Sequence, residues 1–124
     1  MKDADRPPDV VLTEVAPMLA ILATRGLYEE QPELWKLGER GRARTLEDFE
    51  HHFQALQWLE VAAFQAHVQY CEDLFAARDF PRKWLDDAWR WMAVVITREL
   101  PPSVNKPALA VLRQVVGVGG NGRR

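Results

Sequence analysis

The stretch WLDDAWRWMAVVITRELPP, residues 84–102, decides the fold class of this chain. Its apolar residues recur every three or four positions, which is the period of one face of an α-helix. These residues are Leu85, Ala88, Met92, Val95 and Ile96. Tryptophans at positions 84, 89 and 91 widen this apolar face, so the helix is expected to contact more than one neighbour. The prolines at positions 101 and 102 cannot continue the helix and end it near position 100.

The region before this segment, residues 45–81, carries two more apolar stripes at helical spacing. We expect a helix to begin at Thr45, which can act as an N-cap, and to carry the apolar pattern onward. One unbroken helix over residues 46–78 would be roughly 50 Å long at about 1.5 Å per residue, too long for so small a domain. A break is therefore predicted around residues 59–63, with the next boundary at Asp79 and Pro81.

The two ends of the chain add further helices. Residues 10–26, VVLTEVAPMLAILATRG, follow the helical period, with Asp9 as the expected cap and Gly26 as the expected end. Pro17 removes a backbone donor and should kink this helix or split it. A short helix is expected after Pro32, and a last one over residues 106–116.

No strand alternation flanked by turn residues is present, so the pattern predicts an all-α protein. Five to six helices with short connections indicate a compact antiparallel bundle or a globin-like pack. The predicted organisation is a disordered tail over residues 1–8, one helical domain over residues 9–116, and a flexible glycine-rich tail over residues 117–124.

Composition limits the classes of partner and compartment. The chain has 16 Lys and Arg against 18 Asp and Glu, a net charge of −2, so no nucleic-acid partner is expected. It lacks a run of about 20 apolar residues and an apolar leader, so no membrane partner is expected either. A single cysteine excludes an internal disulfide, and a cytoplasmic location is the simplest prediction.

The three histidines are the first candidates for a site. Neighbouring residues point about 100° apart on a helix, so His51 and His52 cannot both ligate one ion. A di-iron bundle needs a matching Glu-x-x-His elsewhere, and only one other histidine exists, so no metal is predicted. His67 lies within an apolar stripe, one turn before Cys71, where a core histidine and an axial haem ligand have the same surroundings.

Two readings of these residues remain open. In the first there is no cofactor, and Cys71 is a packed core thiol. In the alternative, a tetrapyrrole, haem or cobalamin, or another flat ligand binds with His67 or His52 as its axial ligand, and Cys71 is a further cofactor-binding residue. No constellation of acid, base and nucleophile can be assembled from the sequence, so a non-enzyme is predicted.

The apolar face of the helix predicted over residues 84–100 is wider than one neighbouring helix can cover, which suggests a surface for self-association. Rings at positions 89 and 91 cannot both be buried on one narrow helix face. We therefore predict a homodimer whose interface uses five residues: Trp84, Trp89, Trp91, Met92 and Val95.

Four segments in this order have a familiar pattern: LEDFEHHFQAL, FQAHVQYCEDLFAARDFP, WLDDAWRWMAVVITRELPP and PALAVLRQVV. Over residues 45–116 the chain resembles the helical amino-terminal modules of bacterial sensory and regulatory proteins, which precede cobalamin-binding or STAS-type output domains. The resemblance implies an all-helical module, globin-like without haem in some relatives and often dimeric. It implies signal input and contact with a protein partner or output domain rather than catalysis.

Overall fold

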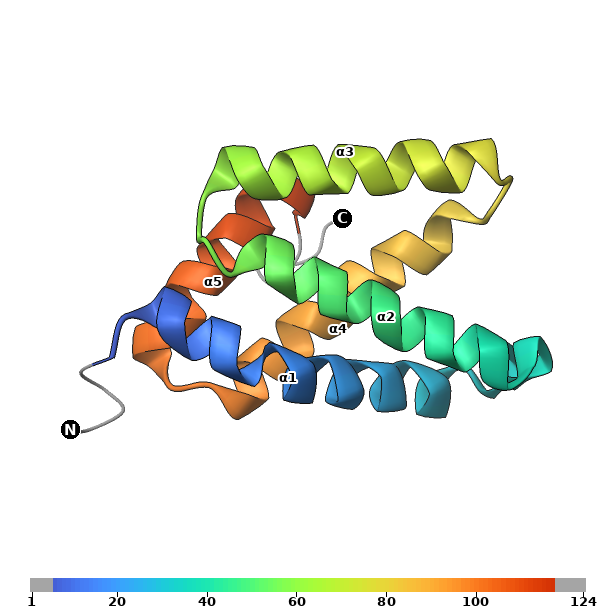
Figure 1. Ribbon diagram of the computed structural model, residues 1–124, viewed down its shortest axis with the longest axis horizontal. Coiled ribbons are helices and arrows are strands. Elements are labelled where there is room, and N and C mark those ends of the chain that lie inside the picture. The colour runs from blue at the N-terminus through green and yellow to red at the C-terminus, as the bar shows by residue number, and fades with distance from the viewer. Residues whose placement is uncertain (1–5, 118–124) are drawn as a thin grey trace.

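The computed structural model describes residues 6–117, and these residues form five α-helices and one 3-10 helix (Figure 1). The elements are α1 (Pro8–Glu30), η2 (Pro32–Leu37), α2 (Gly38–Leu56), α3 (Val61–Ala77), α4 (Arg82–Glu99) and α5 (Pro102–Val116). The described residues contain no strand, which confirms the predicted all-α class.

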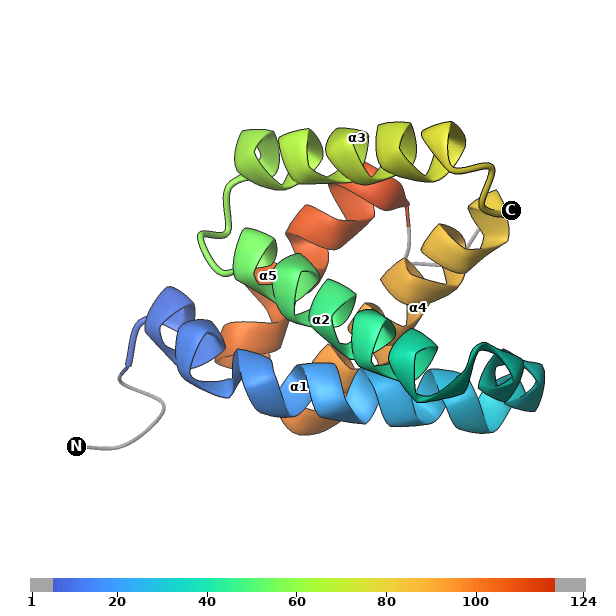
Figure 2. The same cartoon turned by 45° about the vertical axis from the view of Figure 1, so that its right-hand side comes forward.

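The helices form a compact bundle around α4. α1 and α2 run side by side in opposite directions and are connected through η2, as Figure 1 shows. α4 crosses behind them and packs on α1, α3 and α5, while α3 covers the far side of the bundle (Figure 2). α5 fills the remaining space between α1, α3 and α4. Each helix thus buries one apolar stripe against at least two others, which is how short helices obtain their stability.

The core confirms the period read from residues 84–102. The largest fully buried side chains come from all five α-helices: Trp89, Phe49, Phe53, Phe64, Leu12, Leu19, Leu56, Leu85, Met92, Ile96, Leu112 and Val104. A fully buried side chain of this size contributes about 1.5–3 kcal/mol through removal from water. The apolar face of α4 is therefore buried in the core of the same chain.

The prediction that the first helix ends at Gly26 is wrong. α1 continues to Glu30, and the glycine serves a close approach instead. A Cβ at Gly26 would lie 2.3 Å from a ring carbon of Trp91 on α4. Pro17 does not split the helix either, because it lies on the exposed side, where water can satisfy the backbone carbonyl that loses its partner.

Several predicted helix starts are displaced. Asp9 lies in the first turn of α1, whose N-cap is Pro7. Thr45 lies inside α2, where its hydroxyl donates to the Gly41 carbonyl at 3.0 Å, and it is not a cap. The N-cap of α4 is Pro81 and not Asp79. α5 begins at residue 102, four residues earlier than predicted, because Pro102 fits a first helical turn.

The predicted break between the second and third long helices is confirmed. α2 ends at residue 56 and α3 begins at residue 61, with Leu59 in the left-handed region at φ 57°. The predicted tail over residues 1–8 is too long by one residue, since α1 includes Pro8; its residues 1–5 lie outside the described chain. Gly117 ends α5 at φ 79°, and the rest of the predicted C-terminal tail, residues 118–124, also lies outside it.

One described helix, α1, is long and apolar enough to cross a membrane by length and composition alone. This is weak evidence, because the core helix of a soluble protein passes the same test. Nine side chains of α1 are buried within the fold: Val11, Leu12, Ala16, Leu19, Ala20, Ala23, Thr24, Leu27 and Tyr28.

The close approach of α1 and α4 gives a first prediction. Gly26→Ala should destabilise the protein by about 1–3 kcal/mol, because the added methyl overlaps the Trp91 ring. Helix propensity alone predicts the opposite sign, a gain of about 1 kcal/mol. Urea denaturation of the single variant measures this difference.

A double-mutant cycle provides the control for that measurement. In a Trp91→Leu background the overlap is absent, so Gly26→Ala should cost little or should stabilise. Equal costs in both backgrounds would mean that the indole does not constrain Gly26.

Candidate functional site

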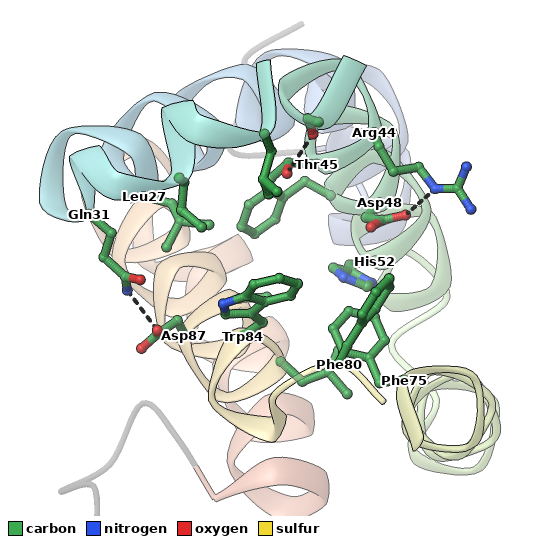
Figure 3. A pocket seen from close by; sticks show the side chains of 16 residues that line it. Leu27, Gln31, Arg44, Thr45, Asp48, His52, Phe75, Phe80, Trp84 and Asp87 are labelled. Atoms are coloured by element: carbon green, nitrogen blue, oxygen red, sulfur yellow. Dashed lines mark hydrogen bonds and ion pairs between the residues drawn. The ribbon is translucent and has the colours of Figure 1, made fainter. Parts of the chain in front are cut away.

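A cavity of about 310 Å³ lies between the end of α1, η2, α2, the end of α3 and the start of α4 (Figure 3). Sixteen residues line it: Leu27, Gln31, Leu34, Leu37, Gly41, Arg44, Thr45, Asp48, Phe49, His52, Phe75, Phe80, Trp84, Leu85, Asp87 and Ala88. This volume is at the lower end of the range of small-molecule sites, about 300–1,000 Å³. Mainly apolar walls with a few polar groups are typical of small-molecule sites.

The turn after α3 places an aromatic side chain at the edge of this cavity. The Phe80 amide donates to the Phe75 carbonyl at 2.9 Å, and the Asp79 amide donates to the Ala76 carbonyl at 3.1 Å. With Asp79 left-handed at φ 56°, this is a Schellman helix end. The rings of Phe75 and Phe80 meet edge to face at 5.3 Å, and Trp84 lies 5.5 Å beyond. Phe80 remains 40% exposed.

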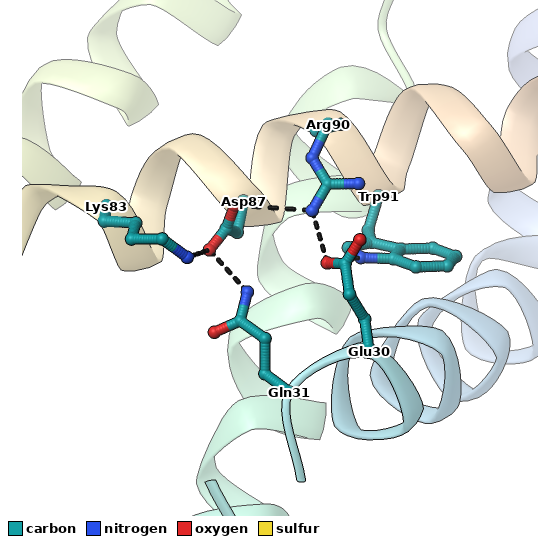
Figure 4. A network of polar contacts seen from close by, with 6 residues as sticks. All are labelled: Glu30, Gln31, Lys83, Asp87, Arg90 and Trp91. Carbon is teal, nitrogen blue, oxygen red and sulfur yellow. Dashed lines mark hydrogen bonds and ion pairs between the residues drawn. The ribbon is translucent and has the colours of Figure 1, made fainter. Parts of the chain in front are cut away.

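One polar side of the cavity is a network that joins the end of α1 to α4 (Figure 4). The Gln31 amide donates to Asp87 at 2.6 Å, and Lys83 lies 2.7 Å from the same carboxylate. Burial raises the pKa of Asp87, but the hydrogen bonds from Lys83 and Gln31 outweigh it and hold that pKa below its usual value. This carboxylate is therefore ionised and already well partnered.

The same network clamps α1 to α4 at the Trp91 contact. Arg90 pairs with Glu30, and the Trp91 indole N–H donates to Glu30 at 3.0 Å. These two hydrogen bonds lower the pKa of the Glu30 carboxyl. Arg90 also reaches Asp87 at 3.3 Å, so the clamp and the cavity edge form one connected network.

The second polar side is formed by Asp48 and Arg44 on α2, whose charged groups are 3.8 Å apart. Burial raises the pKa of Asp48, and the positive charge of Arg44 opposes this only in part. Since the ion pair is loose, the carboxyl of Asp48 keeps capacity to accept a hydrogen bond from a molecule in the cavity.

His52 follows Asp48 by one helical turn and connects the cavity to a second cluster. Its Nδ1 lies 2.9 Å from Nε2 of His67 on α3, and Sγ of Cys71 lies 3.5 Å from the same Nε2. The three ligand-type atoms all lie within 4.8 Å of one another. His52 lines the cavity, whereas His67 and Cys71 do not.

All three groups of this cluster are uncharged. Burial lowers the pKa of His52 well below its ordinary value, and the neighbouring His67 adds to the effect. Burial also lowers the pKa of His67, with a smaller contribution from His51. For Cys71, burial raises the thiol pKa to about 11, and Asp48 and Glu72 contribute further.

The aromatic surroundings of His52 are dense. The Trp89 ring lies 4.7 Å from the His52 ring, and Phe64 lies 5.9 Å from Trp89. Within the described residues the indole N–H of Trp89 is buried with no hydrogen-bond acceptor. The His52 ring is thus fixed by ring contacts and by one hydrogen bond.

The structure corrects most of the predicted dimer interface. Trp89 is 2% exposed, Met92 0% and Val95 3%, so their side chains belong to the chain's own core. Trp84 and Trp91 are half-buried, one at the cavity and the other in the α1–α4 clamp. α4 contacts four neighbouring helices, α1, α2, α3 and α5, and its apolar width is used mainly within the chain.

The sequence placed His67 and Cys71 one turn apart on the same helix, but it did not predict that His52 meets them, because His52 is on a different helix. It also missed Gln31, Asp48 and Asp87 as cavity residues. Charged and amide side chains are mostly solvated, and no local pattern indicated that these three would face a cavity between helices.

No family model, curated protein or solved structure matches the chain in comparisons with known proteins. The likeness to sensory modules and the globin-like alternative therefore stay predictions.

The buried histidine pair gives a second prediction. His52 is neutral in the folded state and titrates near its ordinary value of 6.5 when unfolded. Between the lowered folded pKa and 6.5 the unfolded chain binds more protons, so the free energy of unfolding must fall as the pH drops below 6.5. The slope contributed by one such group is at most about 1.4 kcal/mol per pH unit.

Urea denaturation from pH 7.5 down to pH 5 should show this slope in the wild type and a shallower one in His52→Gln. His51→Gln is the matched control, since His51 is exposed and adjacent, and it should keep most of the wild-type slope because the charge of His51 is the smallest cause of the lowered pKa of His52 and His67. Parallel pH profiles for wild type and His52→Gln would contradict a buried neutral imidazole.

Proposed function

We propose that the protein is a non-catalytic regulatory module that binds a small, mainly apolar molecule in the cavity between α1, α2 and α4. The observation that carries this proposal is the 310 Å³ cavity, with aromatic walls and polar groups at two sides. A regulatory role implies that ligand binding in the cavity changes the contact with a protein partner, as in the sensory modules that the sequence resembles.

The lining defines the chemistry of the proposed ligand. Four aromatic rings, those of Phe49, Phe75, Phe80 and Trp84, favour a flat or aromatic body. Asp87 is satisfied by protein donors, while Asp48 has only a distant arginine. The free acceptor in the cavity is therefore Asp48, and it favours a ligand that carries a hydrogen-bond donor, above all a cationic amine.

The state of Cys71 supports a non-catalytic role. With its pKa raised to about 11, the thiol stays protonated at neutral pH and is a poor nucleophile. The chain's one serine, Ser103, lies at the start of α5, whereas the cavity is lined by α1 to α4 and η2.

The tetrapyrrole alternative keeps limited support. An axial ligand must present a ring nitrogen to the cavity, and of the two predicted histidines only His52 lines it. Its Nδ1 is already hydrogen-bonded to His67, which leaves Nε2. A cavity of 310 Å³ is better suited to a single aromatic ring system than to a macrocycle.

The third prediction tests the cavity with three probes: benzylamine, phenol and benzoate. We expect benzylamine to bind most tightly and benzoate least, because Asp48 attracts a cation and repels an anion. Amide chemical-shift changes in two-dimensional NMR spectra would report the affinity and the position of binding. The largest shifts should fall around residues 44–52 and 84–88.

Two variants and a control make this test specific. Ala88→Leu should fill the cavity and abolish binding of all probes, while Asp48→Asn should weaken benzylamine about fivefold or more and phenol less. Asp86→Asn, an exposed carboxylate on α4, should change neither affinity. Shifts scattered over the surface, or binding that survives Ala88→Leu, would contradict the proposal.

Homodimerisation remains a second candidate property, with a different face from the one predicted. On the exposed side of α1, Glu14, Met18, Ile21 and Arg25 follow at intervals of four, three and four residues. Met18 is 43% exposed and Ile21 44%. Such spacing makes a single stripe along the helix.

The stripe is complementary to itself. If two copies of α1 pack antiparallel about a two-fold axis between positions 19 and 20, Met18 meets Ile21 of the partner, and Glu14 meets Arg25 of the partner. Arg25 has no ion pair among the described residues, whereas Glu14 pairs with Arg6 in its own chain. Exchange of that intrachain pair for an intermolecular one costs little, because exposed ion pairs are weak.

The fourth prediction concerns this α1 stripe and uses charge reversal. Glu14→Arg and Arg25→Glu each place like charges opposite one another in the dimer, so each should weaken association about three- to tenfold. The double variant restores opposite charges and should recover most of the affinity. Sedimentation equilibrium measures the dimer dissociation constant of all four proteins.

A monomeric wild type at tens of micromolar would remove the dimer proposal. So would a double variant that associates no more tightly than the single ones.

The cytoplasmic location and the protein partner stay part of the proposed role, and neither follows from the fold.

A further inference from the structure

We infer that His52, His67 and Cys71 form a binding site for one thiophilic transition-metal ion of the Zn²⁺ class. This site is distinct from the cavity chemistry of the proposed function and does not depend on it. The sequence alone predicted no metal, because the adjacent His51 and His52 cannot share one ion and no second Glu-x-x-His is present.

The placement of the three residues follows from the helix geometry. His67 and Cys71 are four residues apart on α3, so their side chains lie on the same face of that helix. His52 faces them from α2, with its Nδ1 at 2.9 Å from His67 Nε2. Two ligands from one helix and a third from a packed neighbour make a rigid set, since the backbone of both helices is fixed by the core.

Two of the three distances between ligand atoms are near those of a tetrahedral site, and the third, from His52 Nδ1 to Cys71 Sγ, lies within 4.8 Å. Zinc bonds of about 2.0–2.1 Å to nitrogen and about 2.3 Å to sulfur in a tetrahedron place two nitrogens roughly 3.3 Å apart. The same geometry places nitrogen and sulfur roughly 3.5 Å apart. His67 Nε2 and Cys71 Sγ already lie at 3.5 Å. The two imidazole nitrogens, now in hydrogen-bond contact, need to separate by only a few tenths of an ångström.

The chemical form of the ligands also suits a metal. Both imidazoles are kept neutral by burial, which is the form that ligates. Two nitrogens and one sulfur form a borderline-soft donor set, which favours Zn²⁺ and Co²⁺ over Mg²⁺ or Ca²⁺. Cys71 must lose its proton to ligate, so binding has to release one proton from the thiol.

Access to the cluster is available from one side. His52 and Cys71 are buried, whereas His67 is half-exposed at the edge between α2 and α3. Three protein ligands leave a fourth tetrahedral position for water or another small ligand.

The alternative is an ordinary pair of core histidines that satisfy each other through one hydrogen bond. In that case the thiol packs against the pair and binds nothing. The two cases differ in what happens when a metal with a visible spectrum is added.

The test uses the full chain without a histidine tag, freed of metal by a chelator and titrated with Co²⁺. We expect one equivalent to produce tetrahedral visible bands together with a thiolate-to-cobalt charge-transfer band. Zn²⁺ should displace the cobalt spectrum. In unbuffered solution near pH 7.5, each ion bound should release about one proton.

Cys71→Ser should remove the charge-transfer band, and His67→Gln should lower Zn²⁺ affinity more than about 100-fold, beyond the usual cost of losing an outer-shell partner. His51→Gln is the matched control, because His51 is adjacent to the site but exposed, and it should bind like the wild type. Circular dichroism of each variant separates loss of the site from loss of the fold.

The inference is overturned if the folded wild type shows no charge-transfer band with excess Co²⁺. It is overturned equally if the band persists in folded Cys71→Ser or if His51→Gln lowers the affinity as much as His67→Gln. Because neither Ala88 nor the charge of Asp48 is altered in these variants, failure here leaves the test of the ligand cavity unaffected.

Discussion

The arrangement of the bundle depends on the contact between Gly26 of α1 and the indole of Trp91 on α4. A side chain at position 26 would overlap the ring, so the two helices reach their observed separation only with glycine there. The same ring donates to Glu30, which also pairs with Arg90. Steric fit and charge thus act at one crossing, and the position of η2 and of the cavity edge follows from it.

The ligand cavity and the metal-type cluster have His52 in common. One edge of this ring belongs to the cavity wall, while its Nδ1 faces His67 and its ring contacts Trp89. The ring is therefore a mechanical link between an apolar chamber and a set of donor atoms. A metal ion bound to His52, His67 and Cys71 would fix the orientation of the His52 ring. A molecule in the cavity contacts the same ring, so the two binding events would be coupled.

Much of the fold could be predicted from the sequence, because apolar period and proline position are local signals. The stripe in residues 84–102 identified a core helix, and the break near Leu59 followed from helix length. The end of α1 was missed because Gly26 was treated as a local stop signal, although its role is contact with a ring 65 positions later in the chain, a tertiary relation. For the same reason Asp48 and Asp87 were missed as cavity residues, since the place of an acidic side chain in a cavity wall depends on neighbouring helices.

The Schellman end of α3 has a kinetic consequence. Phe80 forms part of the cavity wall yet is 40% exposed, and its amide is tied to the carbonyl of Phe75 in the last turn of the helix. Rotation about its own side-chain bonds moves the ring without disturbing this turn, whereas displacement of the whole residue requires the turn to fray. A molecule too large to pass when only the ring turns would therefore enter and leave at the rate at which this helix terminus frays, which is slower than side-chain rotation.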